Sequence, residues 1–326
     1  MADSDPISTP SSGRRVLVTG SLAFDQIMNF PGKFQDHILP DKLHMINISF
    51  LVEERRIQRG GCAANIAYGL SLLGEQAAVV AAAGHDFGGY RAYLEDLGVD
   101  VSGIRVFDDL PTAACFIPTD RADNHITGFH PGAMARAREL SVEAAVTAGE
   151  TKPAFAVVAP DDPEAIVRHC REAKRAGVPL VFDPSFQVVA LDGDALRDAA
   201  RGARVVLVND YEYAIIQDKT GFGEADLLDL APIWVVTLGE KGSRIAVTGG
   251  ETIDVPACPA REVVDPTGAG DAYRAGFVAG LLRGLDLEVC GRMGSVSAVY
   301  AVESYGTQAH RFTRDEFAAR YHEAFG

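Results

Sequence analysis

The sequence predicts an α/β fold in which a doubly wound, mostly parallel β-sheet is flanked by helices and carries a small strand-rich insertion. Short, continuous apolar runs recur along the chain and end in polar, Gly or Pro residues, as expected for strands buried on both faces. Helical patterns fill the intervals between these runs. Two stretches instead alternate loosely between apolar and polar residues, which indicates strands with one exposed face.

Length and composition narrow the class of protein. With 326 residues the chain can form one large α/β domain with an insertion. Residues 1–13 are rich in Ser, Pro and Asp and are predicted to be a flexible tail, which leaves 14–326 as the folded domain. The net charge of −15 argues against nucleic acid or an anionic membrane as a partner, because binding those surfaces needs basic patches.

Other features of the composition bear on location and redox state. No stretch approaches the ~20 apolar residues of a membrane span. Acidic residues stand where a signal peptide would be basic, so a cytoplasmic location is expected. The five cysteines are scattered without zinc-ligand spacing, and we expect them to be reduced thiols.

The first strand is predicted at residues 16–19, a β-branched run that ends at Gly20. In an α/β sheet, ligand-binding residues follow the carboxyl ends of the strands, and Asp25 would lie just beyond this end. Its carboxylate could accept hydrogen bonds from two neighbouring sugar hydroxyls. A role in forming the turn is the alternative.

Two segments, about 29–58 and 111–130, are predicted to form the strand-rich insertion, because no helical period holds and apolar residues alternate loosely. Three phenylalanines in these segments are candidates for contact with an aromatic ligand: Phe50, Phe116 and Phe129. Ordinary packing in the core is the alternative for each of them.

A helix is predicted from about Ala63 to Leu73, directly after Gly60 and Gly61. The glycines would allow the backbone to approach a ligand closely. Asn65, in the first turn, can donate and accept hydrogen bonds, which suits a ribose hydroxyl and a structural cap equally well.

Continuous apolar runs predict further strands at residues 79–84, 155–159, 180–184, 205–209 and 234–239. Helices are predicted in the intervals, among them 163–176 and 286–302. This alternation is typical of a doubly wound sheet.

Polar residues follow two of these strands. Asn209 and Glu212 are spaced to lie on one helical face or to form a capping box. The loop that holds Thr237, Gly239 and Gly242 offers a hydroxyl and two glycines, so a nucleotide could pass close to its backbone.

The stretch from Val264 to Phe277 predicts a tight turn that leads directly into a helix, because two glycines bracket one small residue and an apolar run follows. The backbone amides of Gly268, Ala269 and Gly270 at a helix start favour an anion such as a phosphate. Asp271 would repel that phosphate unless it had a task of its own. Accepting a proton from an attacking hydroxyl is such a task, and helix capping is the alternative.

Two motifs carry a resemblance to a known family. Asp265-Pro-Thr-Gly-Ala-Gly-Asp271 resembles the C-terminal signature of the ribokinase-like (PfkB) carbohydrate and nucleoside kinases, and Arg59-Gly-Gly-Cys-Ala-Ala-Asn65 resembles their N-terminal signature. The Walker and Rossmann glycine patterns do not fit this turn. Within the family, the likeness to bacterial adenosine kinases runs from Val16 to the C-terminus. It includes segments outside both signatures, such as 129–134 and 303–308, which bear on the substrate class.

The resemblance implies a ribokinase-like fold in which the inserted segments form a lid over the substrate and offer a surface for a homodimer. It implies that Asp271 is the catalytic base and that the amides of Gly268, Ala269 and Gly270 stabilise the transferring phosphoryl group. The implied nucleoside-binding residues come from strand ends, the first helix and the lid: Ser21, Asp25, Ser49, Phe50, Gly61, Asn65, Phe116, Phe129 and Gln187.

The resemblance also implies a cofactor side of the site. Contacts to ATP would come from Asn209, Thr237, Gly239 and Gly242. Asn209 and Glu212 would hold water bound to Mg²⁺. Asp265 and Thr267 stand where some relatives bind K⁺, although an Asp before a Pro is also an ordinary turn starter.

Together these features predict an ATP-dependent nucleoside kinase acting on the 5′-hydroxyl of a purine nucleoside, with adenosine favoured. Phe186-Gln187 and Ala190 depart from the two glutamines and the arginine of the adenosine kinases compared, which leaves inosine, guanosine and cytidine open. A sugar kinase of the same family is disfavoured by the lid phenylalanines. A nucleotide-binding regulator without catalysis is disfavoured because Asp271 and its turn are intact.

Overall fold

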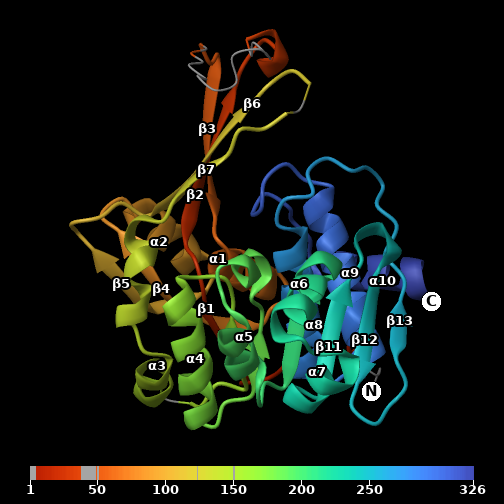
Figure 1. Cartoon of the computed structure of the whole chain (residues 1–326). Coiled ribbons are helices and arrows are strands. Elements are labelled where there is room, and N and C mark those ends of the chain that lie inside the picture. Colours follow the sequence, from red (N-terminus) through yellow and green to blue (C-terminus); the bar gives the residue numbers. More distant parts are fainter. Residues whose placement is uncertain (1–4, 38–48, 50, 123, 150) are drawn as a thin grey trace.

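The computed structural model describes residues 5–37, 49, 51–122, 124–149 and 151–326. Within these residues, nine strands form one sheet in the order β13-β12-β11-β10-β9-β8-β1-β4-β5. Neighbours pair in parallel except β11 with β12 and β12 with β13. Figure 1 shows this sheet in the body of the molecule and a second, smaller sheet standing out from it. The predicted α/β class is confirmed.

The strands of the central sheet are β1 (Arg15–Thr19), β4 (Gln76–Gly84), β5 (Asp100–Phe107), β8 (Phe155–Val158), β9 (Leu180–Phe182), β10 (Val205–Asn209), β11 (Ile233–Thr237), β12 (Ser243–Val247) and β13 (Ile253–Val255). The α-helices are α1 (Cys62–Leu72), α2 (Gly88–Asp96), α3 (Val142–Ala148), α4 (Pro163–Arg175), α5 (Gly193–Ala200), α6 (Asp210–Thr220), α7 (Glu224–Leu230), α8 (Ala269–Arg283), α9 (Leu287–Val302) and α10 (Arg314–Phe325). Short 3-10 helices are η1 (Phe34–Asp36), η3 (Gly132–Glu139), η4 (Ser185–Val189) and η5 (Gly239–Lys241).

The two faces of the central sheet carry separate hydrophobic cores. Val16 and Val18 of β1 pack into a core with residues of α1, α2, α8, α9 and α10. Leu17, between them, packs into the other core with residues of α4, α5 and α7. Successive side chains of a strand point to opposite faces, so a strand covered on both sides needs an unbroken apolar run.

The smaller sheet, hereafter the lid, has the strand order β3-β2-β6-β7. Its strands are β2 (Ala23–Asn29), β3 (Glu54–Gly60), β6 (Ala113–Thr119) and β7 (Gly128–His130). The first lid segment therefore begins at residue 23, earlier than the predicted 29. Asp25 lies inside a lid strand and not in a turn after β1.

The described part of the predicted tail, residues 5–13, packs on the body of the protein. Ile7 is buried within the core that contains α8 and α10. Its carbonyl oxygen accepts a hydrogen bond from Arg283, and the Ser11 amide donates to the Glu75 carboxylate. The expectation of flexibility fails for this stretch because one apolar side chain and these polar contacts offset the entropy cost of ordering it.

Helix α8 is the most deeply buried helix of the site. It begins after Gly268, whose φ of 81° lies in the left-handed region that glycine tolerates best. Almost all of its residues from Asp271 to Leu282 are buried. The buried helix therefore fixes the position of the glycine turn that precedes it.

Two further expectations concern membranes and thiols. In the described residues, no helix is long and apolar enough to cross a membrane. All five cysteines are free thiols, three of them buried: Cys170, Cys258 and Cys290.

Candidate active site

The glycine turn and the carboxylate singled out from the sequence lie at the start of α8. The turn of Gly268, Ala269 and Gly270 leads into α8, and Asp271 lies in its first turn. A Cβ at Gly268 would lie 3.0 Å from the Thr307 side chain, so both the backbone angle and the space require glycine there. The first amides of a helix have no acceptor within it, which leaves this turn suited to an anion.

Asp271 is held in a buried and charged environment. The Asn65 side-chain amide donates to its carboxylate at 2.9 Å. Burial raises the pKa of Asp271, while Arg274 and the Asn65 hydrogen bond oppose that rise. A carboxylate of raised basicity fits a general base better than a surface cap.

Arg274 and Asp183 form an ion pair that the sequence analysis did not assign. Arg274 lies on α8, and its guanidinium donates to the Asp183 carboxylate at 2.6 Å. Both side chains are almost fully buried. Burial raises the pKa of Asp183, and Arg274 opposes that rise. The available signal was an arginine inside an apolar helix, three residues after Asp271.

Asn65 is part of a chain of hydrogen bonds. Its side-chain oxygen accepts from the Gln308 amide at 2.8 Å. Gln308 also donates to the Tyr90 hydroxyl at 2.5 Å, and that hydroxyl donates to the Gly60 carbonyl at 2.9 Å. The chain fixes the Asn65 amide so that its N–H group points to Asp271.

Asp25 faces Asp271 and Asp265 from the lid. Burial, and then the charges of Asp265 and Asp271, raise the pKa of Asp25 to about 6. A Cβ at Gly60 would come within 2.5 Å of its carboxylate, so the glycine makes room for Asp25. No hydrogen bond from a described residue lowers this pKa, which leaves the carboxylate oxygens available to ligand hydroxyls.

Strand register separates the lid phenylalanines. Asp25 pairs with Cys115, and Cys115 pairs with Phe129, so these three side chains share one face. Phe116 pairs with Gln26 and lies on the opposite face. Because neighbouring residues of a strand alternate in direction, Phe116 and Asp25 cannot both contact a ligand on one face of the lid.

Two of the other lid residues give less information. Ser49 is exposed. Phe50 lies outside the described residues.

Ser21 and Gly61 connect the lid to the body. The Ser21 hydroxyl accepts from the amide of Cys62, the first residue of α1. Gly61 has a φ of 94°, and a Cβ there would lie 2.6 Å from the Ser21 carbonyl oxygen. Both residues therefore help to hold the connection between lid strand β3 and helix α1.

Gln187 lies beside the carboxyl ends of β8 and β9. Its side-chain amide donates to the Asp161 carbonyl at 2.7 Å, and the residue is buried. Phe186 is exposed next to it. Ser185 has a φ of 42°, a strained value for a non-glycine residue, of the kind often found at functional sites.

Asn209 and Glu212 form the capping box that the sequence left open. The Glu212 amide donates to the Asn209 side-chain oxygen at 2.8 Å, and the Asn209 amide donates to the Glu212 carboxylate at 2.8 Å. Glu212 is nevertheless close enough to Asp271 to raise the pKa of that carboxyl group. In the described residues, no group of three or more His, Cys, Asp or Glu side chains could hold a metal ion by itself.

The loop after β11 divides into an open and a packed part. Thr237 pairs with Asn209 across β10 and β11, so both lie at the carboxyl edge of the sheet. Gly239 has open space around it. A Cβ at Gly242 would collide with the Val255 carbonyl oxygen, so packing against β13 explains this glycine.

Asp265 holds the turn that begins the motif. One carboxylate oxygen accepts from the Thr267 amide at 2.9 Å and the other accepts from the Gly306 amide at 3.0 Å. This is the turn-forming role that the sequence allowed. Thr267 itself is exposed.

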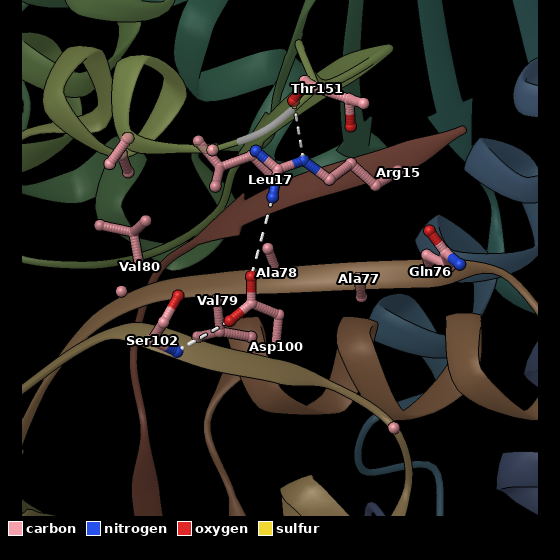
Figure 2. A pocket seen from close by; sticks show the side chains of 15 residues that line it. Arg15, Leu17, Gln76, Ala77, Ala78, Val79, Val80, Asp100, Ser102 and Thr151 are labelled. Atoms are coloured by element: carbon pink, nitrogen blue, oxygen red, sulfur yellow. Dashed lines mark hydrogen bonds and ion pairs between the residues drawn. The ribbon is translucent and has the colours of Figure 1, made fainter. Parts of the chain in front are cut away.

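A separate cavity of about 530 Å³ lies at the opposite edge of the sheet. Its wall includes Arg15, Gln76 and Asp100, the first residues of β1, β4 and β5. Figure 2 shows Arg15 between Thr151 and Asp100 at this edge. Ligand sites of open α/β sheets lie at the carboxyl ends of the strands, so this cavity is not part of the site around Asp271.

The doubly wound sheet, the protruding lid and the glycine turn at the start of α8 define a ribokinase-like kinase. A family model described as pfkB family carbohydrate kinase matches residues 22–313. The chain belongs to this family and is a phosphotransferase that acts on a hydroxyl group.

The chain is also similar to proteins with the name nucleoside kinase. It is 34% identical to the nucleoside kinase of Methanothermobacter thermautotrophicus over 97% of this chain and 98% of that protein. It is 31% identical to that of Methanocaldococcus jannaschii over 94% of this chain and 96% of that protein. The solved structure of Burkholderia thailandensis nucleoside kinase in complex with inosine matches with a TM-score of 0.85 and 38% identity. That match covers 95% of this chain and 98% of the solved chain.

Proposed function

We propose that this protein is a nucleoside kinase that transfers the γ-phosphate of ATP to the 5′-hydroxyl of a purine nucleoside, with adenosine as the favoured substrate. The observation that carries the proposal is the position of Asp271. It lies in the first turn of α8, directly after the anion-binding turn, and faces a lid whose Asp25 has free acceptor oxygens.

In the proposed reaction the oxygen of the 5′-hydroxyl bonds to the γ-phosphorus, and the Asp271 carboxylate accepts the proton of that hydroxyl. The bond from that phosphorus to the β,γ-bridging oxygen breaks, and ADP leaves. The amides of Gly268 and Gly270 stabilise the charge on the transferring group. Arg274 favours the ionised form of Asp271, because its positive charge opposes the pKa rise caused by burial.

The lid side of the site would hold the nucleoside. Asp25 would accept hydrogen bonds from two ribose hydroxyls. Phe129 shares its face of the lid and is 45% exposed, so its ring is available to the base. Asn65 would act through Asp271, since its amide already donates to that carboxylate.

Magnesium carried by ATP would neutralise part of the charge on the phosphates. Glu212 and Asn209 would face this ion through water, because their side chains already bond to each other. Thr237 and Gly239 would line the path of the nucleotide. A K⁺ ion at Asp265 and Thr267 would need oxygens beyond the Asp265 carboxylate, both of whose oxygens accept amide hydrogen bonds.

Inosine is a second candidate substrate, because the similar Burkholderia thailandensis enzyme has been solved with inosine and also with ADP and inosine. This chain is also 30% identical, over 76% of its length, to a Thermococcus kodakarensis protein with the name cytidine kinase. Cytidine should therefore be tested as a pyrimidine substrate. Exposed Phe186 beside buried Gln187 gives this chain an aromatic surface near the proposed base site.

The deciding experiment is a panel of adenosine, inosine, guanosine, cytidine and ribose with ATP and Mg²⁺, with each product identified by mass and by the position of its phosphate. Conversion of adenosine to its 5′-monophosphate with the highest kcat/KM supports the full proposal. Preference for inosine would move the assignment to the second candidate. Phosphorylation of ribose alone would refute a nucleoside kinase.

A surface for a homodimer is also proposed on the lid. Ile57 and Phe116 are exposed and lie on the lid face opposite Asp25. Light scattering of the protein, compared with an Ile57→Lys variant, would test this assembly.

A further inference from the structure

A small pocket outside the proposed nucleoside site lies where the lid meets the body. Its volume is about 210 Å³, and Ile57, Gln58 and Arg59 of β3 form one wall. Tyr93 of α2 and the chain segment 306–311 complete it. Arg59 pairs with Phe24, so its side chain lies on the lid face opposite Asp25. Gln58 pairs with Asp25 and shares its face, so the pocket lies at the free edge of β3 and is lined by residues from both faces of the lid.

Two arginines, Arg59 and Arg311, line this pocket without a carboxylate partner among the described residues. The Arg59 guanidinium lies 4.2 Å from the centre of the Tyr93 ring. Arg311 donates to the carbonyl oxygens of Gln308 and His310 and lies over the ring of Tyr68. Aromatic stacking and these carbonyls fix the two cations in place and leave guanidinium N–H groups for a ligand.

We propose that this pocket binds a phosphate group, either as inorganic phosphate or as part of a small phosphate ester. Two guanidinium groups match the charge of a phosphate dianion, and each can present a pair of parallel N–H donors to its oxygens. In a chain with a net charge of −15, such a site needs local cations without carboxylate partners, and this pocket has two.

The wall of the pocket is also the support of the catalytic turn. The Gly306 amide donates to Asp265, and the Thr307 side chain packs against Gly268. The Gln308 side-chain amide donates to Asn65 at 2.8 Å, and the Asn65 side-chain amide donates to Asp271 at 2.9 Å. Gly306 and Thr307 thus contact the turn directly, and Gln308 reaches Asp271 through Asn65.

An anion between the arginines would join the lid to the body. Arg59 is the second-last residue of the lid strand β3, which ends at Gly60, whereas Arg311 lies in the body between α9 and α10. The Thr307 hydroxyl already donates to the Arg59 carbonyl at 3.0 Å across this junction. Lids must open to release product, so a phosphate that holds β3 against segment 306–311 would lower kcat without competing with ATP.

Isothermal titration calorimetry with sodium phosphate tests the site. We expect binding to the wild-type protein to weaken by about tenfold or more in Arg59→Gln and in Arg311→Gln, since each loses a charged pair of hydrogen bonds. Arg314→Gln, an exposed arginine at the start of α10 that does not line the pocket, is the matched control and should bind as the wild type does. Equal affinity in all four proteins would place any phosphate at the catalytic turn and overturn the proposal.

A second measurement remains decisive if a variant fails to fold. Crystals of the wild-type protein soaked in tungstate should show anomalous density between Arg59 and Arg311, and its absence there would refute the site. In kinetics at constant ionic strength, added phosphate should lower kcat of the wild type and leave that of Arg311→Gln unchanged. A rise in the KM for ATP alone would refute the coupling to the lid. The binding tests do not depend on the proposed function. If the proposed function were wrong, the protein would show no nucleoside kinase activity even when no phosphate is added.

Discussion

Replacing Arg274 by Gln should raise the pH at which the enzyme becomes active and should destabilise the fold. Arg274 is buried, and its partner Asp183 is completely buried, with 2.6 Å between a guanidinium nitrogen and a carboxylate oxygen. The same guanidinium opposes the rise that burial causes in the pKa of Asp271. A neutral amide would leave both carboxyl groups without this positive charge.

The expected sizes follow from the geometry. Breaking a buried ion pair by removing one partner costs about 3–5 kcal/mol of unfolding free energy. Side chains three residues apart on a helix lie about 5–6 Å from each other. At an effective dielectric constant of about 20, a unit charge at that distance contributes about 3 kcal/mol, which corresponds to a rise of up to about 2 units in the pKa of Asp271. Only the ionised carboxylate accepts a proton. The kcat of the variant should therefore be low at pH values below the raised pKa of Asp271 and should recover at higher pH.

The assay is kcat as a function of pH, together with urea unfolding. Helix α8 supplies a matched control at its other end, where Arg283 forms a buried ion pair with Glu75 at 2.8 Å. Arg283→Gln should lose similar stability and keep the wild-type pH profile, and Arg274→Lys should restore part of the profile. If Arg274→Gln and Arg283→Gln share one pH profile, Arg274 acts only in folding and the electrostatic reasoning is refuted.

Three further predictions concern single side chains of the site. Asp271→Asn should lower kcat by about 10²–10⁴ while ATP binding, followed by calorimetry, stays nearly unchanged; near-normal turnover would reduce Asp271 to a helix cap. Asp25→Ala should raise the nucleoside KM by about 10- to 150-fold, from the roughly 1.5–3 kcal/mol of a charged hydrogen bond, and leave the ATP KM largely unaffected. An equal rise in both constants would remove Asp25 from the sugar site. Phe129→Ala should raise the nucleoside KM, whereas Phe116→Ala, on the other lid face, should not; equal effects would contradict the register argument.

The central sheet could be predicted because its strands are buried on both faces. The runs at 79–84, 155–159 and 205–209 are continuous in apolar residues and match β4, β8 and β10. β5 alternates between buried and exposed residues at the sheet edge and gave no such signal. β2 was missed for a related reason: its side chains are mostly half-buried, so Asp25 was expected just beyond the end of the first strand and not inside a strand of its own.

The catalytic turn could be predicted from local sequence, because a left-handed glycine followed by a helix is a short-range feature. The contacts that support it could not. Arg274 and Asp183 are 91 residues apart, and Gln308 and Asn65 are 243 residues apart. Each pair meets only in the folded protein, since Asp183 follows β9 and Arg274 lies on α8, while Asn65 lies on α1 and Gln308 lies between α9 and α10.

The charges around this turn bear on how a triphosphate could bind beside it. Asp25, Asp265 and Asp271 are close enough for the latter two to raise the pKa of the first, and Glu212 acts in the same way on Asp271. Arg274 opposes this negative charge, and a helix N-terminus adds the equivalent of only about half a positive charge. A bare triphosphate would therefore meet a repulsive field at the place where it has to bind. In the proposed reaction one of these carboxylates accepts the proton and another holds the sugar, so both are needed. Mg²⁺ bound to the phosphates would offset the repulsion in that reaction without a dedicated cage of protein ligands.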